Sequence, residues 1–113
     1  MQTLIDITRP LFERYGMDYY LAVLSLNSRC CATLLSIYYQ QEVAASRERA
    51  ENLYKELLLA VQDAGYQQYR TGTLGSESLY RHCPEYGQLL SRIKTAVDPE
   101  GILSPGKYGI SLG

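Results

Sequence analysis

Two neighbouring apolar runs with a period of two constrain this sequence most. In the first run, residues 19–26, alternate side chains fall on opposite faces of an extended chain, and both faces are apolar. The polar segment 27–29 has the composition of a turn, and the second run continues from Cys30 to Tyr39. Such a pair predicts an antiparallel hairpin. Because both faces are apolar, we expect helices or another chain to cover it.

Apolar residues at helical spacing over 4–15 predict a helix before the hairpin. Pro10 lies inside this pattern, so the helix either kinks there or begins near Thr8. Gly16 follows the last apolar position and supplies a left-handed stop. The hairpin is therefore preceded by one helix that ends in a glycine.

The second half of the chain predicts two more helices with a strand between them. The clearest helix begins near Ser46 and ends at Gly65, residues 66–71 have the composition of a short strand, and Pro84 opens a last helix. We expect that last helix to turn an apolar stripe inward, formed by Leu89, Leu90, Ile93, Ala96 and Val97.

The order of these elements predicts an α+β fold. We expect a small antiparallel sheet with helices on one face, arranged α-β-β-α-β-α as part of a ferredoxin-like fold. The 113 residues fit a single domain, 1–113, and residues 98–113 form an irregular tail that starts with a turn at Asp98. A sheet of three strands leaves an exposed edge, which invites pairing with a second copy of the chain.

Charge and sorting signals exclude several classes of function. The net charge of −1 argues against nucleic-acid or membrane-surface partners, which favour a basic excess. No apolar stretch is long enough to cross a bilayer, and no signal peptide is visible. We therefore expect a cytoplasmic location.

The three cysteines do not form a recognisable site. Cys30 and Cys31 are adjacent, and with Cys83 the number is odd, which argues against a disulfide framework. His82 is the only histidine, so we expect no metal site. A nucleophile pair of Cys83 and His82 is a third alternative, but neighbours in sequence rarely point at each other, and two ordinary side chains are expected.

The segment 65–71 contains a candidate anion site at Tyr69 and Arg70. Neighbours on a strand point to opposite faces unless the strand ends or bulges there, and at such an end both side chains converge on one oxyanion. The guanidinium is always charged, and the tyrosine adds a neutral donor. The alternative is a solvent-exposed arginine beside a core tyrosine.

The glycine-rich tail, residues 97–110, is a second candidate site. Its glycines let the backbone approach a ligand closely, and Lys107 adds positive charge. The alternative is a strap that packs Ile102, Leu103 and Ile110 on the core.

Together, these two stretches resemble the C-terminal end of the FAD-linked oxidases of the vanillyl-alcohol oxidase and 4-cresol dehydrogenase family. The tail resembles the family's ending almost position by position, and the order of elements agrees over nearly the whole chain. The resemblance implies a cap, or substrate, domain in which Tyr69 and Arg70 bind the phenolate oxygen of a para-alkylphenol. It also implies that Arg70 and Lys107 lie near the flavin, which takes a hydride from the benzylic carbon.

The family's FAD-binding domain is absent from this sequence. We therefore expect a C-terminal fragment or subunit of a flavin-dependent oxidoreductase acting on 4-alkylphenols, which binds no FAD and is not catalytic alone. Its partner is then a second copy, in a homodimer, or a separate FAD-domain chain. The alternative is a non-enzymatic small-molecule-binding or homo-oligomeric assembly module that reuses the fold.

The 11 tyrosines, against one phenylalanine and no tryptophan, are compatible with that assembly module. Four of them gather on the predicted hairpin, where we expect packing or a dimer contact: Tyr19, Tyr20, Tyr38 and Tyr39.

Overall fold

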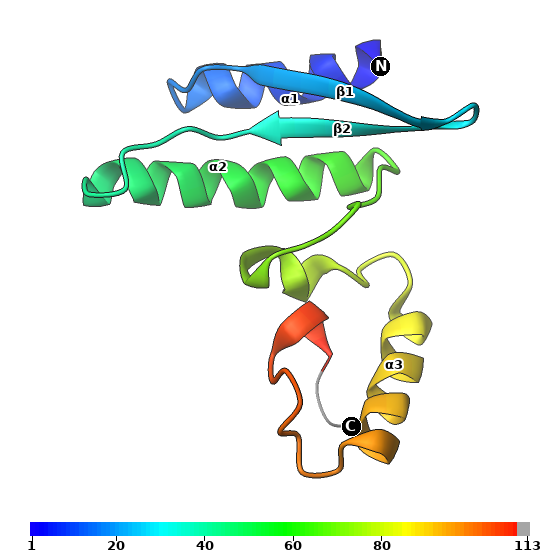
Figure 1. Ribbon diagram of the computed structural model, residues 1–113. Helices are drawn as coiled ribbons and strands as arrows, with labels where there is room; N and C mark the ends of the chain where they lie inside the picture. Colours follow the sequence, from blue (N-terminus) through cyan, green and yellow to red (C-terminus); the bar gives the residue numbers. More distant parts are fainter. Residues whose placement is uncertain (111–113) are drawn as a thin grey trace. The chain divides into compact units, whose positions relative to one another are not determined.

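The computed structural model describes residues 1–110 (Figure 1). The chain divides into two compact units, Met1–Tyr69 and Arg70–Gly113. We call them the first and the second unit. The single-domain prediction for residues 1–113 stays a prediction, and the last three residues of the predicted tail lie outside the described residues.

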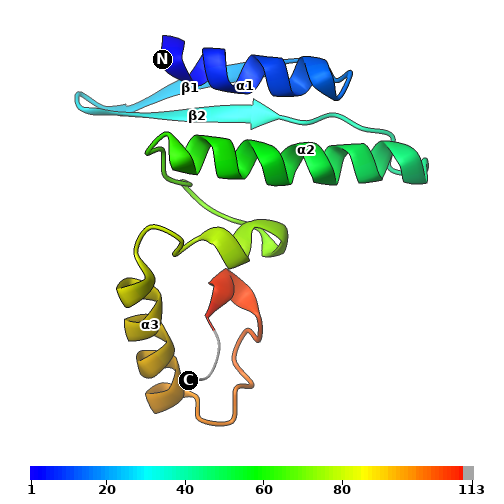
Figure 2. The ribbon, with the colours of Figure 1, turned by 180° about the vertical axis from the view of Figure 1, so that it is seen from behind.

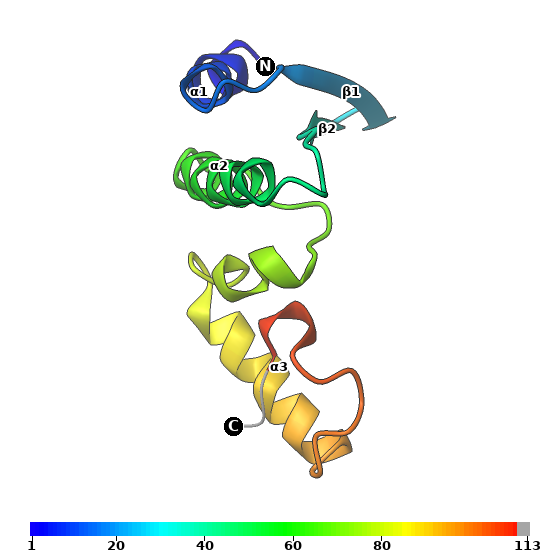
Figure 3. The same cartoon turned by 90° about the vertical axis from the view of Figure 1, so that its left-hand side faces the viewer.

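The first unit contains two helices and an antiparallel hairpin, which confirms the α+β class. Both helices lie on the same face of the hairpin (Figure 3). The elements, in chain order, are α1 (Gln2–Arg14), β1 (Tyr20–Asn27), β2 (Cys30–Ser36) and α2 (Ala44–Asp63).

Helix α1 runs without interruption past Pro10, so the alternative start near Thr8 is wrong. Thr8 is instead buried in the middle of the helix, where its hydroxyl donates to the carbonyl of Leu4 at 2.8 Å and lies 2.7 Å from the Tyr19 hydroxyl. Gly16 ends the helix with φ 61°, as predicted. The buried polar group thus has partners both in its own helix and in the segment before β1.

The core of the first unit forms where both helices meet one face of the hairpin. Phe12, Leu53 and Leu57 are buried there, and the ring of Tyr19 meets that of Phe12 edge-on at 5.2 Å between centroids. Leu35 in β2 packs against the same cluster. Each fully buried side chain of this size contributes roughly 1.5–3 kcal/mol to folding.

The register of the hairpin separates an inner face from an outer face. Tyr20 pairs with Ser36, Ala22 with Leu34 and Leu24 with Ala32, and a bulge follows between Ser25 and Asn27. The turn extends beyond the ends of both helices (Figures 1 and 2). The prediction that helices cover the hairpin is confirmed for the inner face only. Both α1 and α2 lie on that side.

The predicted strand over residues 66–71 is wrong, because this segment is irregular. Gly65 adopts φ 85°, and the amide of Tyr66 donates to the carbonyl of Val61 at 3.0 Å. These contacts form the C-terminal cap of α2 and turn the chain away from an extended path. The sheet of the described residues therefore has two strands, and the third strand of the ferredoxin-like arrangement is missing.

Over its described residues, 70–110, the second unit contains one regular helix and two short 3-10 helices. They are η1 (Thr73–Ser78), α3 (Pro84–Val97) and η2 (Lys107–Gly109). Helix α3 begins at Pro84 as predicted, but none of its residues is buried. The predicted inward stripe is therefore wrong: Leu89, Ile93 and Val97 are exposed.

The tail starts with the predicted turn, in which the amide of Gly101 donates to the carbonyl of Asp98 at 3.0 Å. Ile102 and Leu103 are exposed, so the alternative of a strap packed on a core is wrong for these two residues. Across residues 1–110, no helix is long and apolar enough to cross a membrane.

Candidate functional site

Tyr69 and Arg70 lie in the irregular segment that follows α2. Both side chains are exposed, and Tyr69 keeps 73% of its surface open to solvent. The boundary between the two units falls between these residues. The strand end that we expected to orient the two side chains is not formed. Their role as a phenolate site is not tested and stays a prediction.

Lys107 opens η2, directly after Gly106 in the left-handed conformation (φ 69°). It lines a hollow of about 270 Å³ whose other walls come from α3 and the tail. Most of that wall is apolar, formed by Leu90, Ile93, Val97, Leu103, Tyr108 and Ile110. Lys107 is thus an exposed cation at the edge of an apolar hollow. Neither Tyr69 nor Arg70 lines this hollow.

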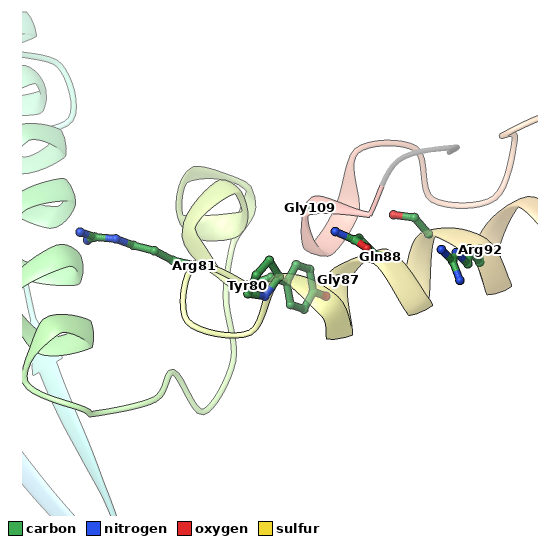
Figure 4. Close-up of a pocket in the computed structure, with 8 residues that line it drawn as sticks. Tyr80, Arg81, Gly87, Gln88, Arg92 and Gly109 are labelled. Atoms are coloured by element: carbon green, nitrogen blue, oxygen red, sulfur yellow. The ribbon is translucent and has the colours of Figure 1, made fainter.

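A larger hollow of about 570 Å³ lies between the start of α3 and η2 (Figure 4). Gln88 reaches from α3 toward the turn that carries Gly109, whereas Arg81 extends away from the other labelled side chains. Arg92, Ser91 and Tyr80 add further donors to the lining. Guanidinium, amide and phenol donors together suit an anionic group.

Gly87 lets the Tyr80 ring lie against α3. A Cβ atom at position 87 would stand 3.0 Å from ring atoms of Tyr80. Burial raises the pKa of Tyr80 above its ordinary value, and the neighbouring Tyr86, 5.9 Å away between ring centroids, raises that pKa further. At neutral pH Tyr80 is therefore an uncharged donor. Glycine inside a helix costs about 1 kcal/mol relative to alanine, so Gly87 was the sequence signal for this close approach.

The side chain of Asp98 fixes the start of the tail. It accepts hydrogen bonds from the amides of Ile102 and Leu103, both at 3.0 Å, and forms an ion pair with Lys94. Lys94 also donates to the carbonyl of Leu103. The hydrogen bond from Lys94 is the main reason why the pKa of Asp98 lies below its ordinary value. We call these four residues the Asp98 cluster.

Sequence reasoning placed Asp98 in a turn but missed its ion pair. The spacing of Lys94 and Asp98, four residues apart, was the available signal.

The cysteines offer no shared site in the described residues. Cys30, Cys31 and Cys83 are free and exposed. Within residues 1–110 there is no group of three or more potential ligands that would hold a metal ion. The Cys83 and His82 pair stays untested as a nucleophile.

Comparisons with known proteins found one matching domain family and two similar curated proteins. The family described as "FAD linked oxidases, C-terminal domain" matches residues 33–108. The flavoprotein subunit of 4-cresol dehydrogenase (hydroxylating) from Pseudomonas putida is 30% identical over 107 residues. A 1'-carboxy-chondrochloren decarboxylase from Chondromyces crocatus is 26% identical over 106 residues.

Both alignments cover 94% of this chain but 20% of the relative. The chain therefore spans about a fifth of the length of the curated relatives it matches. No solved structure matches it.

Proposed function

We propose that this chain, which belongs to the C-terminal domain family of the FAD-linked oxidases, supplies the substrate-binding part of a flavin-dependent oxidoreductase that acts on 4-alkylphenols. The observation that carries the proposal is the 30% identity to a 4-cresol dehydrogenase flavoprotein subunit, which extends over 107 residues. FAD is the cofactor for which the family is named.

In this proposal, Tyr69 and Arg70 bind the phenolate oxygen of the substrate. Both side chains are exposed and free to turn toward a ligand. Arginine offers charged donors and tyrosine a neutral donor, and charge-assisted hydrogen bonds are the stronger kind. Holding a phenol as its anion raises the electron density at the para carbon, which favours loss of hydride from the attached alkyl group. The chain's own contribution is thus to bind and stabilise the phenolate form, whose proton has been lost to solvent.

The described residues do not fit a whole FAD. The hollow beside Lys107 measures about 270 Å³, below the 300–1,000 Å³ or so of pockets that enclose drug-sized ligands. The larger hollow contains neither Arg70 nor Lys107, the two residues predicted to lie near the flavin. We therefore assign the flavin to an FAD-binding domain that these residues do not include, and infer that this chain is not catalytic alone.

The proposed location is the cytoplasm. Three free, exposed cysteines are compatible with a compartment that keeps thiols reduced.

Titration of the chain with 4-cresol, followed by NMR, tests the proposed phenol site. We expect saturable shifts at residues 69 and 70, and weaker binding by Arg70→Gln because the charged donors are lost. Arg49→Gln, which removes an exposed arginine from α2, is the matched control and should bind like wild type. Equal binding by both variants, or no saturable shift in wild type, would contradict the proposal.

The second candidate function is a non-enzymatic assembly module. It is favoured by one observation, the apolar outer face of the hairpin, which leaves Leu24 and Leu34 exposed. Binding of 4-cresol distinguishes the two candidates, because neither of them requires this chain to hold FAD by itself. A sample that binds 4-cresol supports the oxidoreductase part, and a sample that does not bind it supports the assembly module.

A further inference from the structure

We infer that the outer face of the hairpin is a docking surface for a second copy of this chain. The outer hairpin face consists of alternate residues on β1 and β2 together with a tyrosine after β2: Tyr20, Ala22, Leu24, Leu34 and Tyr38. This inference is independent of phenol binding, since it uses neither Tyr69 nor Arg70.

The helices of the first unit do not cover this face. Leu35 packs on the core cluster from the inner side of β2, and its neighbour Leu34 points the other way. Figure 3 shows α1 and α2 together on the inner side. The large side chains of the outer face accordingly keep about half or more of their surface exposed: Tyr20 52%, Leu24 50%, Leu34 45% and Tyr38 68%.

The chemistry of the face favours a copy of itself over a partner of different sequence. Neither β1 nor β2 contains Asp, Glu, Lys or Arg. A twofold interface brings the same patch against itself, so like charges would repel, whereas an uncharged patch is self-complementary. Selective recognition of another protein typically uses complementary charges, and these strands carry none.

The hairpin also has few of the features that prevent an exposed strand edge from pairing with another chain. Within residues 1–110 each strand pairs with only one neighbour, so each has an unpaired edge. Monomeric proteins protect such edges with charged side chains, prolines or bulges. Strands β1 and β2 contain no charged residue and no proline, and the bulge between Ser25 and Asn27 is the one protective feature within them.

The exposed area of the outer hairpin face is large enough to form the centre of a dimer interface. A tyrosine buries roughly 150–250 Å² when fully covered, so four half-exposed large side chains present on the order of 400 Å². A stable dimer buries about 800 Å² on each partner, of which the apolar centre is a part and a polar rim the rest. The rings of Tyr20 and Tyr38 already meet edge-on at 5.1 Å, so less side-chain freedom is lost on docking.

Sedimentation velocity over a range of concentrations tests the inference. Wild type should sediment at twice the chain mass at high micromolar concentration. Leu34→Glu should raise the dimer dissociation constant roughly tenfold or more, because docking would bury an unpaired carboxylate. Leu59→Glu is the matched control, an exposed leucine on α2, and should dimerise like wild type.

Two hairpin cysteines provide a second readout that does not depend on a folding-sensitive variant. Alternation in β2 places Cys30 on the outer side with Leu34 and Cys31 on the inner side. In a Cys83→Ser background, maleimide labelling of Cys30 should slow as concentration rises, whereas Cys31 should react at a constant rate.

Three results would overturn the inference: a wild-type monomer at 100 micromolar or so, a dimer that Leu59→Glu weakens as much as Leu34→Glu, or equal protection of both cysteines. A monomer that instead binds an FAD-domain chain through Leu34 would assign the face to that partner. Loss of 4-cresol binding alone would contradict the proposed function and leave this inference intact.

Discussion

The first unit excludes large apolar side chains from solvent, whereas the second unit buries a charged one. Phe12 and Leu53 are fully buried between α1, α2 and the hairpin. In the described residues of the second unit, 70–110, no large apolar side chain is buried, but Asp98 is only 4% exposed. One unit thus depends on apolar packing and the other on a polar cluster and on backbone turns.

This difference makes the two units respond to different perturbations. Apolar packing is insensitive to moderate changes in pH but sensitive to lost volume. An ion pair that also accepts amide hydrogen bonds is sensitive to the protonation of its carboxylate. The conformation of the tail, and with it the position of Lys107, should therefore depend on solution conditions more than the hairpin does.

Removing the central ring of the first unit should have the largest effect. Phe12→Ala leaves a cavity against Leu53 and Leu57 and should lower the free energy of unfolding of this unit by about 3–5 kcal/mol. Residue-resolved hydrogen exchange checks this value, and protection should fall most in β1 and α2.

Leu59→Ala, at an exposed position of α2, is the control and should stay within about 0.5 kcal/mol of wild type. If both variants lost the same protection, packing would not distinguish the first unit.

Acid should release the Asp98 cluster. The pKa of Asp98 is lowered in the folded chain, chiefly by the hydrogen bond from Lys94. The stabilisation is therefore complete above the ordinary carboxyl pKa of about 4 and is lost as the pH falls through the lower folded value. The amides of Ile102 and Leu103, followed by NMR from neutral pH into acid, should lose protection in that window.

Asp98→Asn should weaken the same amides at every pH and remove their acid transition. A transition that persists unchanged in this variant would assign the pH dependence to another group.

The smallest effect is expected at Gly87. Gly87→Ala gains about 1 kcal/mol of helix propensity but crowds the Tyr80 ring at 3.0 Å. Because Tyr80 is only partly buried, its ring can move, and the net change in stability should be within about 1 kcal/mol. The pKa of Tyr80 should fall toward its ordinary value as its burial decreases, which a tyrosine titration by NMR measures.

Ala96→Gly is the matched control, an exposed position of α3 that is remote in sequence from Tyr80. It should lower stability by about 1 kcal/mol and leave the tyrosine titration unchanged.

Local patterns predicted the elements of the first unit well. The hairpin, the end of α1 at Gly16 and the end of α2 at Gly65 follow from alternation and from left-handed glycines, which act over a few residues. The same glycine at position 65 made the predicted strand fail, since the cap of α2 continues through the amide of Tyr66. Six residues with strand composition cannot reveal whether a neighbouring edge is available.

The candidate site was predicted less completely than the fold. Tyr69, Arg70 and Lys107 were singled out from their side-chain chemistry, and a resemblance between sequences supplied their roles. The structure leaves all three exposed without testing those roles. Tyr80 and Gly87 were missed because their contact joins a connecting segment to a helix, and no periodic pattern marks such a contact.

By itself, the sequence determined the secondary structure of the first unit, the start of α3 and membership in the family, because these depend on local propensity and on matching residues. The tertiary structure decided which apolar side chains are buried. Leu34 and Leu35 have the same hydrophobicity, yet one faces solvent and the other the core. A sequence pattern assigns residues to faces, but only the packing of α1 and α2 on one side decides which face is covered.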